Sequence, residues 1–130
     1  MSTRATVRFA TREEGVSFNE HPKKWNAQFY KHHDGYPEGL GLDIADSILN
    51  NVKLTNWELE HVDTIHADIE YMYYIWQDHG KSIWMSIFEM NQWSDKDAKC
   101  IFVGTPEKLL TKYGSQLDES HYKLNTNDDG

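Results

Sequence analysis

The chain has 130 residues, of which 38% are hydrophobic and 13% aromatic, so it is long and apolar enough to form one packed domain. Its formal net charge is −8, with nine acids against one lysine in residues 34–70, and such a surface repels duplex nucleic acid and anionic membranes. The lone cysteine excludes an intramolecular disulfide, and no apolar run reaches the ~20 residues of a membrane helix, a pattern that favours a cytoplasmic location.

The first two predicted elements are β-strands. Residues 5–9 and 25–31 both alternate apolar and polar side chains, which is typical of strands that bury one face. In the second segment we expect Trp25, Ala27 and Phe29 to point inward. We predict that the two strands pair antiparallel.

The following segments favour helices. Asp34-Gly35 has the chemistry of a turn and ends the second strand, and residues 39–51 then carry apolar side chains at helical spacing. Residues 55–58 read Thr-Asn-Trp-Glu, a capping-box pattern. They predict a second, short helix that ends near Ile65.

The last third of the chain predicts three strands and a helix. Residues 69–76 and 83–88 are rich in Tyr, Ile and Trp, and the short polar link between them indicates a β-hairpin. Residues 100–103 predict a short buried strand. Thr105 then caps a helix with proline in its first turn, and Gly114 ends that helix.

The predicted order is β-β-α-α-β-β-β-α. We expect a single α+β domain over residues 1–114, in which an antiparallel sheet of about five strands is packed by two or three helices. Residues 115–130 are polar and lack apolar periodicity, so they predict a flexible C-terminal tail.

The most informative segment is residues 30–38, Tyr-Lys-His-His-Asp-Gly-Tyr-Pro-Glu. It gathers a cation, two imidazoles, a carboxylate and two phenols at a strand–loop–helix junction, where backbone N–H groups suit anions. Turn chemistry alone accounts for Asp34, Gly35 and Pro37, so a purely structural role is an equal alternative. The candidate ligand-binding residues are Arg8, Tyr30, Lys31, His32, His33, Asp34 and Tyr36.

Metal binding and catalysis have less support in the sequence. His61 and His66 are five residues apart, and the adjacent His32 and His33 point to opposite faces of a strand, so we expect no metal and no cofactor. Cys100 lies in an apolar strand and is expected to be a buried, inert thiol. No nucleophile elbow or phosphate loop occurs, so we expect a protein without enzymatic activity.

Aromatic side chains occupy both faces of the strand predicted over residues 71–76. One face belongs to the core, and the other is exposed unless a helix, another copy of the chain or a ligand covers it. Coverage by a helix and self-association both stay open, and self-association predicts a homo-oligomer.

Residues 30–39, together with the start at 4–7 and the aromatic strand at 70–73, resemble small uncharacterised bacterial and phage proteins. These proteins carry a Tyr-Lys/Arg-His-x-Asp-Gly-Tyr-Pro segment. The size and element order are also similar to those of phage Thoeris anti-defence (Tad-type) proteins, which are small non-enzymatic oligomers that sequester cyclic ADP-ribose-like immune signals. Arginines are expected to dominate the contacts in that family, whereas this chain has His32 and His33.

The leading hypothesis is a non-enzymatic phage or bacterial protein that binds a small anionic ligand, such as a cyclic nucleotide immune signal, in the host cytoplasm. Arg8, Lys31 and His32 are expected to bind phosphate, and the two tyrosines of the segment to stack on a base. Asp34 is expected to hydrogen-bond a ribose or to orient the neighbouring imidazole.

The alternative hypothesis is an acidic protein-binding inhibitor that acts on a host defence protein, as anti-CRISPR or DNA-mimic proteins do. It follows from the carboxylates of residues 34–70 and from the aromatic strand. A solvated helix face is the simpler explanation of the same charges.

Overall fold

The computed structural model describes residues 3–11, 17, 20–78, 80–91 and 94–114. The elements are β1 (Ala5–Thr11), β2 (Lys24–Lys31), the π-helical turn η1 (Pro37–Gly41), α1 (Leu42–Asn50), β3 (Trp57–Glu60), β4 (Tyr71–Gln77), β5 (Ile83–Asn91), β6 (Ser94–Gly104), α2 (Pro106–Leu109) and the π-helical turn η2 (Leu110–Gly114). The predicted tail 115–130 lies outside the described residues.

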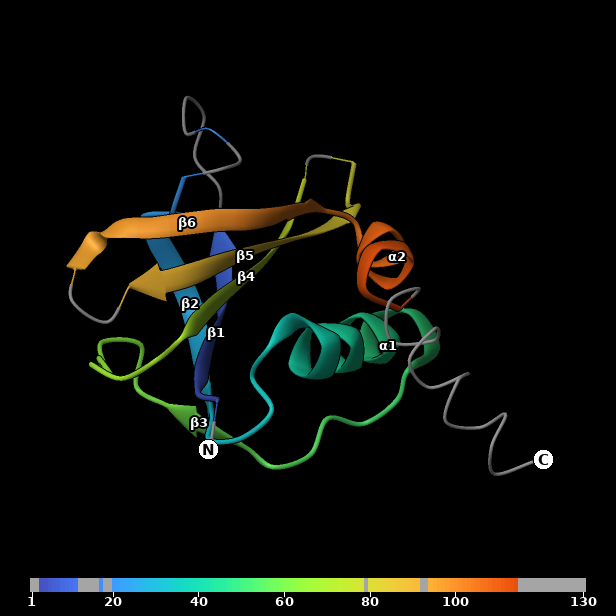
Figure 1. Cartoon of the computed structure of the whole chain (residues 1–130). Coiled ribbons are helices and arrows are strands. Elements are labelled where there is room, and N and C mark those ends of the chain that lie inside the picture. The colour runs from blue at the N-terminus through green and yellow to red at the C-terminus, as the bar shows by residue number, and fades with distance from the viewer. Residues whose placement is uncertain (1–2, 12–16, 18–19, 79, 92–93, 115–130) are drawn as a thin grey trace.

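The strands form one six-stranded sheet in the order β3-β2-β1-β4-β5-β6 (Figure 1). The α+β class is therefore confirmed, but the expected all-antiparallel sheet of about five strands is wrong in detail. The central strands β1 and β4 run parallel, with Ala5 opposite Tyr71 and Phe9 opposite Ile75. A parallel pair needs a long connection between its strands, and here the connection contains β2, α1 and β3.

The predicted antiparallel pairing of the first two strands is confirmed, with Val7 opposite Phe29. The register shifts after Phe9, so that Ala10 lies opposite Trp25. This β-bulge changes the alternation of β2 at its start. Trp25 was expected on the same face as Phe29, but the bulge turns it to the other face.

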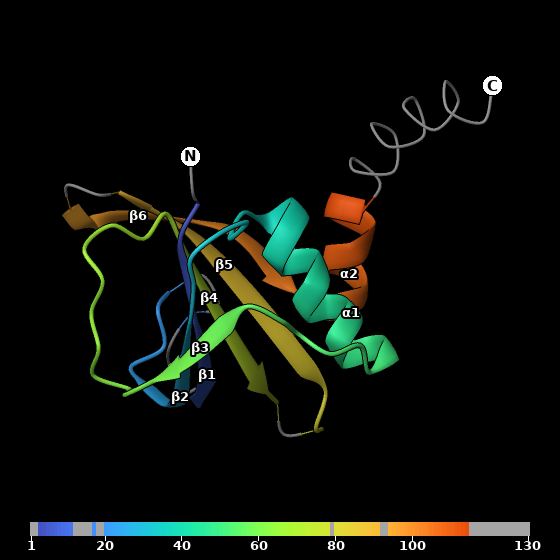
Figure 2. The same cartoon turned by 90° about the horizontal axis from the view of Figure 1, so that it is seen from below.

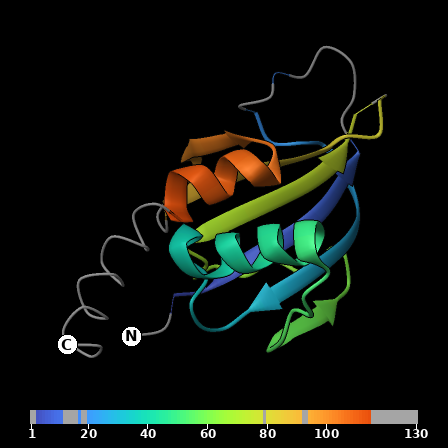
Figure 3. The ribbon, with the colours of Figure 1, turned by 90° about the vertical axis from the view of Figure 1, so that its right-hand side faces the viewer.

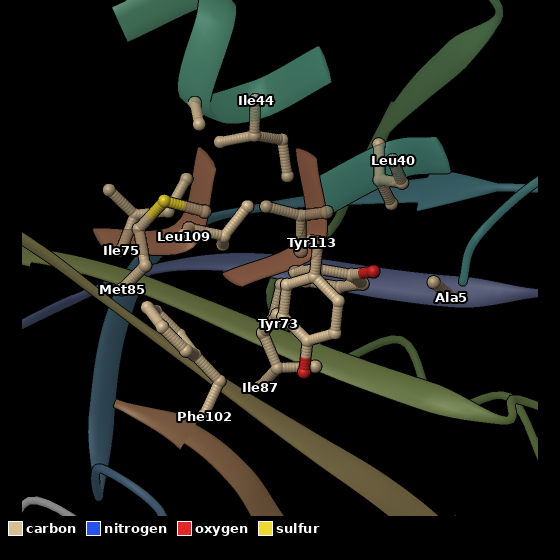
Figure 4. Close-up of a cluster of buried hydrophobic side chains, with 12 residues drawn as sticks. Ala5, Leu40, Ile44, Tyr73, Ile75, Met85, Ile87, Phe102, Leu109 and Tyr113 are labelled. Atoms are coloured by element: carbon tan, nitrogen blue, oxygen red, sulfur yellow. The ribbon is translucent and has the colours of Figure 1, made fainter. Parts of the chain in front are cut away.

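Both helices lie on one face of the sheet (Figure 3). The predicted helix near residues 39–51 is confirmed, and it begins with η1 before α1. Figure 4 shows how side chains from the two helices meet those of the central strands. The buried core on this face comprises Ala5, Val7, Leu40, Ile44, Ala45, Tyr73, Ile75, Met85, Ile87, Phe102, Leu109 and Tyr113.

The predicted helix over residues 55–65 is wrong, because residues 57–60 form the edge strand β3. Asn56 has a φ of 61°, a left-handed conformation that interrupts a right-handed helix. The Trp57 ring then stacks on Phe29 of β2, with ring centroids 4.0 Å apart. Leu59 lies opposite Phe29 in the register. A non-local aromatic contact thus overrides the local capping-box signal.

The predicted C-terminal elements are confirmed, and β6 is longer than the four residues expected. The hairpin of β4 and β5 pairs Tyr73 with Ile87. The hydroxyl of Thr105 accepts a hydrogen bond from the backbone N–H of Lys108, as expected for a helix N-cap. Within the described residues, no helix is long and apolar enough to cross a membrane.

Candidate functional site

Lys31 ends β2 on the face that carries the helices, and its side chain is only 8% exposed. Its ammonium group donates a hydrogen bond of 2.9 Å to the backbone carbonyl of Thr55. Burial raises the pKa of the Asp43 carboxyl, and the positive charge of Lys31 opposes that shift. The ammonium group therefore joins β2 to the segment before β3.

Arg8 lies on the opposite face of the sheet and forms an internal contact there. Its guanidinium lies over the Trp25 ring, 3.8 Å from the centroid, a cation–π geometry. Its Nε donates to Gln28 Oε1 at 2.8 Å, and its Nη1 donates to the Tyr74 hydroxyl at 3.1 Å. The two expected phosphate ligands Arg8 and Lys31 are thus on different faces and do not form one cluster.

Gln28 is the centre of a buried polar network on the face away from the helices, and it is fully buried. Its amide nitrogen donates to Glu60 Oε2 at 2.6 Å and to the carbonyl of Thr64 at 2.8 Å. Glu60 Oε1 lies 2.7 Å from His66 Nε2. The network fastens residues 61–70, which Figure 2 shows on the side of the sheet away from the helices.

Tyr30 is buried between two histidines at the same face. Its ring stacks on His66 with centroids 3.8 Å apart, and His32 meets it edge-on at 4.5 Å. Burial raises the pKa of its phenol, and the Arg4 guanidinium opposes that shift. A ring enclosed in this way has no free face for a base, so the expected stacking role of Tyr30 lacks geometric support.

The exposed part of the segment is formed by residues 32–34 and Tyr36, and the partly exposed Arg4 precedes β1. Ala5 and Lys31 are the end pair of the β1–β2 ladder, and Arg4 and His32 are the next residues of the two segments beyond it. His33 is exposed beside His32, with ring centroids 6.3 Å apart.

The side chains of Arg4 and His32 both contact carboxylates at the surface. Arg4 Nη1 lies 3.0 Å from Asp68 Oδ2, and His32 Nε2 lies 3.1 Å from Glu58 Oε1. All four side chains are 41–65% exposed, so each pair contributes only about 0–1 kcal/mol.

Asp34 and Gly35 lie in the loop between β2 and η1, where the sequence predicts a turn. Asp34 has a φ of 58°, and the Tyr36 hydroxyl donates to its carboxylate at 3.4 Å. The nearby carboxylate raises the pKa of the Tyr36 phenol. Gly35 is enclosed, because an added Cβ would lie 2.7 Å from the Cβ of Ala5. The carbonyl of Gly35 accepts a 2.7 Å hydrogen bond from the buried Tyr73 hydroxyl.

The second aromatic face is buried within the single chain, on the side of the sheet away from the helices. Tyr74, Trp76 and Phe88 are at most 4% exposed within the single chain. The His21 ring stacks on Phe88 with centroids 3.9 Å apart, and its Nδ1 lies 3.0 Å from the Tyr74 hydroxyl. Connecting segments, rather than the expected helix, therefore bury this face within the single chain.

Two further expectations concern reactive groups. Cys100 was expected to be a buried thiol, but it is partly exposed at a bulge of β6. Among the described residues, no three His, Cys, Asp or Glu side chains are arranged to hold a metal ion.

The sequence did not single out Gln28, Glu60 or Arg4. Gln28 and Glu60 occupy strand positions where a polar residue usually faces solvent, so nothing local marks them as buried. Comparisons with family models, with curated proteins and with solved structures found no match to this chain.

Proposed function

We propose that this chain is a non-enzymatic binding protein whose ligand is a small anion, such as a nucleotide or cyclic nucleotide signal. The observation that carries the proposal is that Arg4 precedes Ala5 and His32 follows Lys31, the two residues of the end pair of the β1–β2 ladder. Their carboxylate partners Asp68 and Glu58 are weakly held and exposed, so a phosphate can replace them.

The roles of the segment residues follow from their exposure. Arg4, His32 and His33 supply the cationic and hydrogen-bonding groups for a phosphate. Tyr36 is 38% exposed and is the phenol available for stacking on a base. Lys31 acts on this site through the fold, because its ammonium group is bound to the carbonyl of Thr55.

The test is titration calorimetry with AMP and 3′,5′-cyclic AMP, on the unmodified chain and on variants. We expect Arg4→Ala to weaken binding at least about tenfold, which corresponds to about 1.4 kcal/mol. His61→Ala is the matched control, because His61 is an exposed histidine that also lies near a carboxylate, 3.6 Å from Asp63. The absence of heat for both nucleotides, with an unchanged melting temperature, would rule out a nucleotide ligand.

A second candidate function is the binding and inhibition of a host protein. It is favoured by Leu59 and Ile65, whose side chains are 70% and 85% exposed in the acidic part of the chain. Leu59 lies on the edge strand β3, where an apolar side chain can contact a partner protein. A pull-down that survives Arg4→Ala but is lost after charge reversal within residues 43–63 would favour this candidate.

A further inference from the structure

The two edges of the sheet differ in how well they are protected. On β6, the ammonium group of Lys112 donates a hydrogen bond of 2.9 Å to the backbone carbonyl of Ile101. The register of β5 and β6 also shifts at two places, which marks bulges. A lysine on the edge and a bulged strand are both features that prevent another strand from pairing. The β6 edge is therefore closed at its centre.

The β3 edge lacks these features among the residues that the structure describes. β2 is the only strand that pairs with β3 there, so the other edge of β3 presents free backbone groups. Figure 3 shows β3 at the margin of the sheet, on the side away from α2. Leu59 is 70% exposed on the helix-bearing face, beside the stacked pair of Trp57 and Phe29. Glu58 projects from the other face and its side chain is 65% exposed.

We propose that the β3 edge binds an extended segment of a partner protein by strand addition, and that this segment alternates basic and apolar residues. The inference rests on the protein-binding candidate above and is independent of the nucleotide candidate. A strand paired with β3 places one residue opposite Glu58 and the next opposite Leu59. Complementarity therefore requires Lys or Arg at the first position and an apolar side chain at the second. Asp63, whose side chain is 86% exposed just after β3, adds to the negative charge.

Charge disfavours a second copy of this chain at the same edge. Two antiparallel copies of β3 related by a two-fold axis can be centred on residue 58 or on residue 59. The first register places Glu58 opposite Glu58, and the second places Glu58 opposite Glu60. Like charges directly opposite each other destabilise a strand pair, so the edge is complementary to a basic strand rather than to itself.

The strand is short, and this limits the affinity. β3 has four residues, so a partner strand forms few backbone hydrogen bonds and depends on the side-chain pairs. The binding is expected to be weak and transient, as in many signalling contacts.

The experiment uses a synthetic six-residue peptide that alternates Lys and Ile, with a Glu/Ile peptide of the same pattern as control. Binding is followed by the backbone amide NMR signals of the full chain. We expect the Lys/Ile peptide to shift the signals of residues 57–60 with a dissociation constant below about 1 mM, and the Glu/Ile peptide to cause no shift. N-methylation of alternate Lys/Ile peptide residues, on the edge facing β3, is expected to abolish binding because it removes the pairing N–H groups.

Two variants test the side-chain contribution. Glu58→Lys is expected to weaken Lys/Ile peptide binding at least about fivefold, whereas Glu107→Lys makes the same change of charge on α2 and leaves it unchanged. The proposal is overturned if neither peptide binds, if both bind equally, or if Glu58→Lys has no effect. A dimer of the chain whose interface shifts residues 57–60 also overturns it. If a host protein is captured equally by the unmodified chain and by Glu58→Lys, the chain binds a protein, but it does so at a surface other than the β3 edge.

Discussion

Gln28 provides the sharpest test of the polar network on the face away from the helices. Gln28→Leu keeps a similar volume but removes three hydrogen bonds, two of them to the charged groups of Arg8 and Glu60. A hydrogen bond to a charged group contributes about 1.5–3 kcal/mol, and a neutral one contributes about 1 kcal/mol. The apolar side chain recovers about 1–2 kcal/mol by burial, which leaves a net destabilisation of about 2–6 kcal/mol.

The measurement is urea unfolding, followed by fluorescence and by circular dichroism, with the free energy extrapolated to water. Gln77→Leu is the matched control, because Gln77 is exposed and makes one hydrogen bond of 3.1 Å to the carbonyl of Lys81. We expect the control to change the free energy of unfolding by less than about 0.5 kcal/mol. A loss below about 1 kcal/mol for Gln28→Leu would refute the view that this network holds residues 61–70 on the sheet.

Three further predictions concern two other buried groups and the exposed Lys112 at the β6 edge. Burial raises the pKa of Tyr113 from its usual 10.0 to about 12. The unfolded chain therefore loses this proton first, and the free energy of unfolding falls as the pH rises from 10 to 12. Tyr113→Phe should reduce that fall when urea unfolding is measured across this pH range. The hydroxyl of Ser86 is buried without a hydrogen-bond partner among the described residues, so Ser86→Ala should leave stability unchanged or raise it, and a loss above about 1 kcal/mol would reveal a missing partner. Lys112→Met frees the carbonyl of Ile101 and should make the chain associate at high concentration by sedimentation, whereas Lys108→Met should not.

Local patterns predicted those elements whose contacts are themselves local or alternate regularly. The pairing of residues 5–9 with 25–31, the hairpin and the Thr105 cap all followed from such patterns. The helix predicted from the capping-box pattern of residues 55–58 does not form. Trp57 stacks on Phe29 instead, and Phe29 is too far away in the sequence for a local pattern to reveal this contact. The parallel pairing of the central strands depends in the same way on residues more than sixty positions apart.

The alternation of side chains along the strands also bears on the candidate ligand-binding residues, although it was not used to choose them. Strand alternation places Arg8 on the face opposite to Val7 and Phe9, and it places Lys31 on the same face as Phe29, which was expected to face the core. The separation of Arg8 from Lys31 was therefore predictable from the sequence. The bulge that places Trp25 over Arg8 was not, because one extra residue in β2 leaves no clear mark in the composition.

The parallel contact between β1 and β4 also determines when the chain can complete its fold. During synthesis β1 and β2 emerge first and can form their hairpin, but the other edge of β1 has no partner until residues 71–77 follow. Until then the central strand exposes both its backbone groups and apolar residues such as Val7. Closing so long a loop makes folding slower than hairpin formation, and the nascent N-terminal half is the stage most exposed to aggregation.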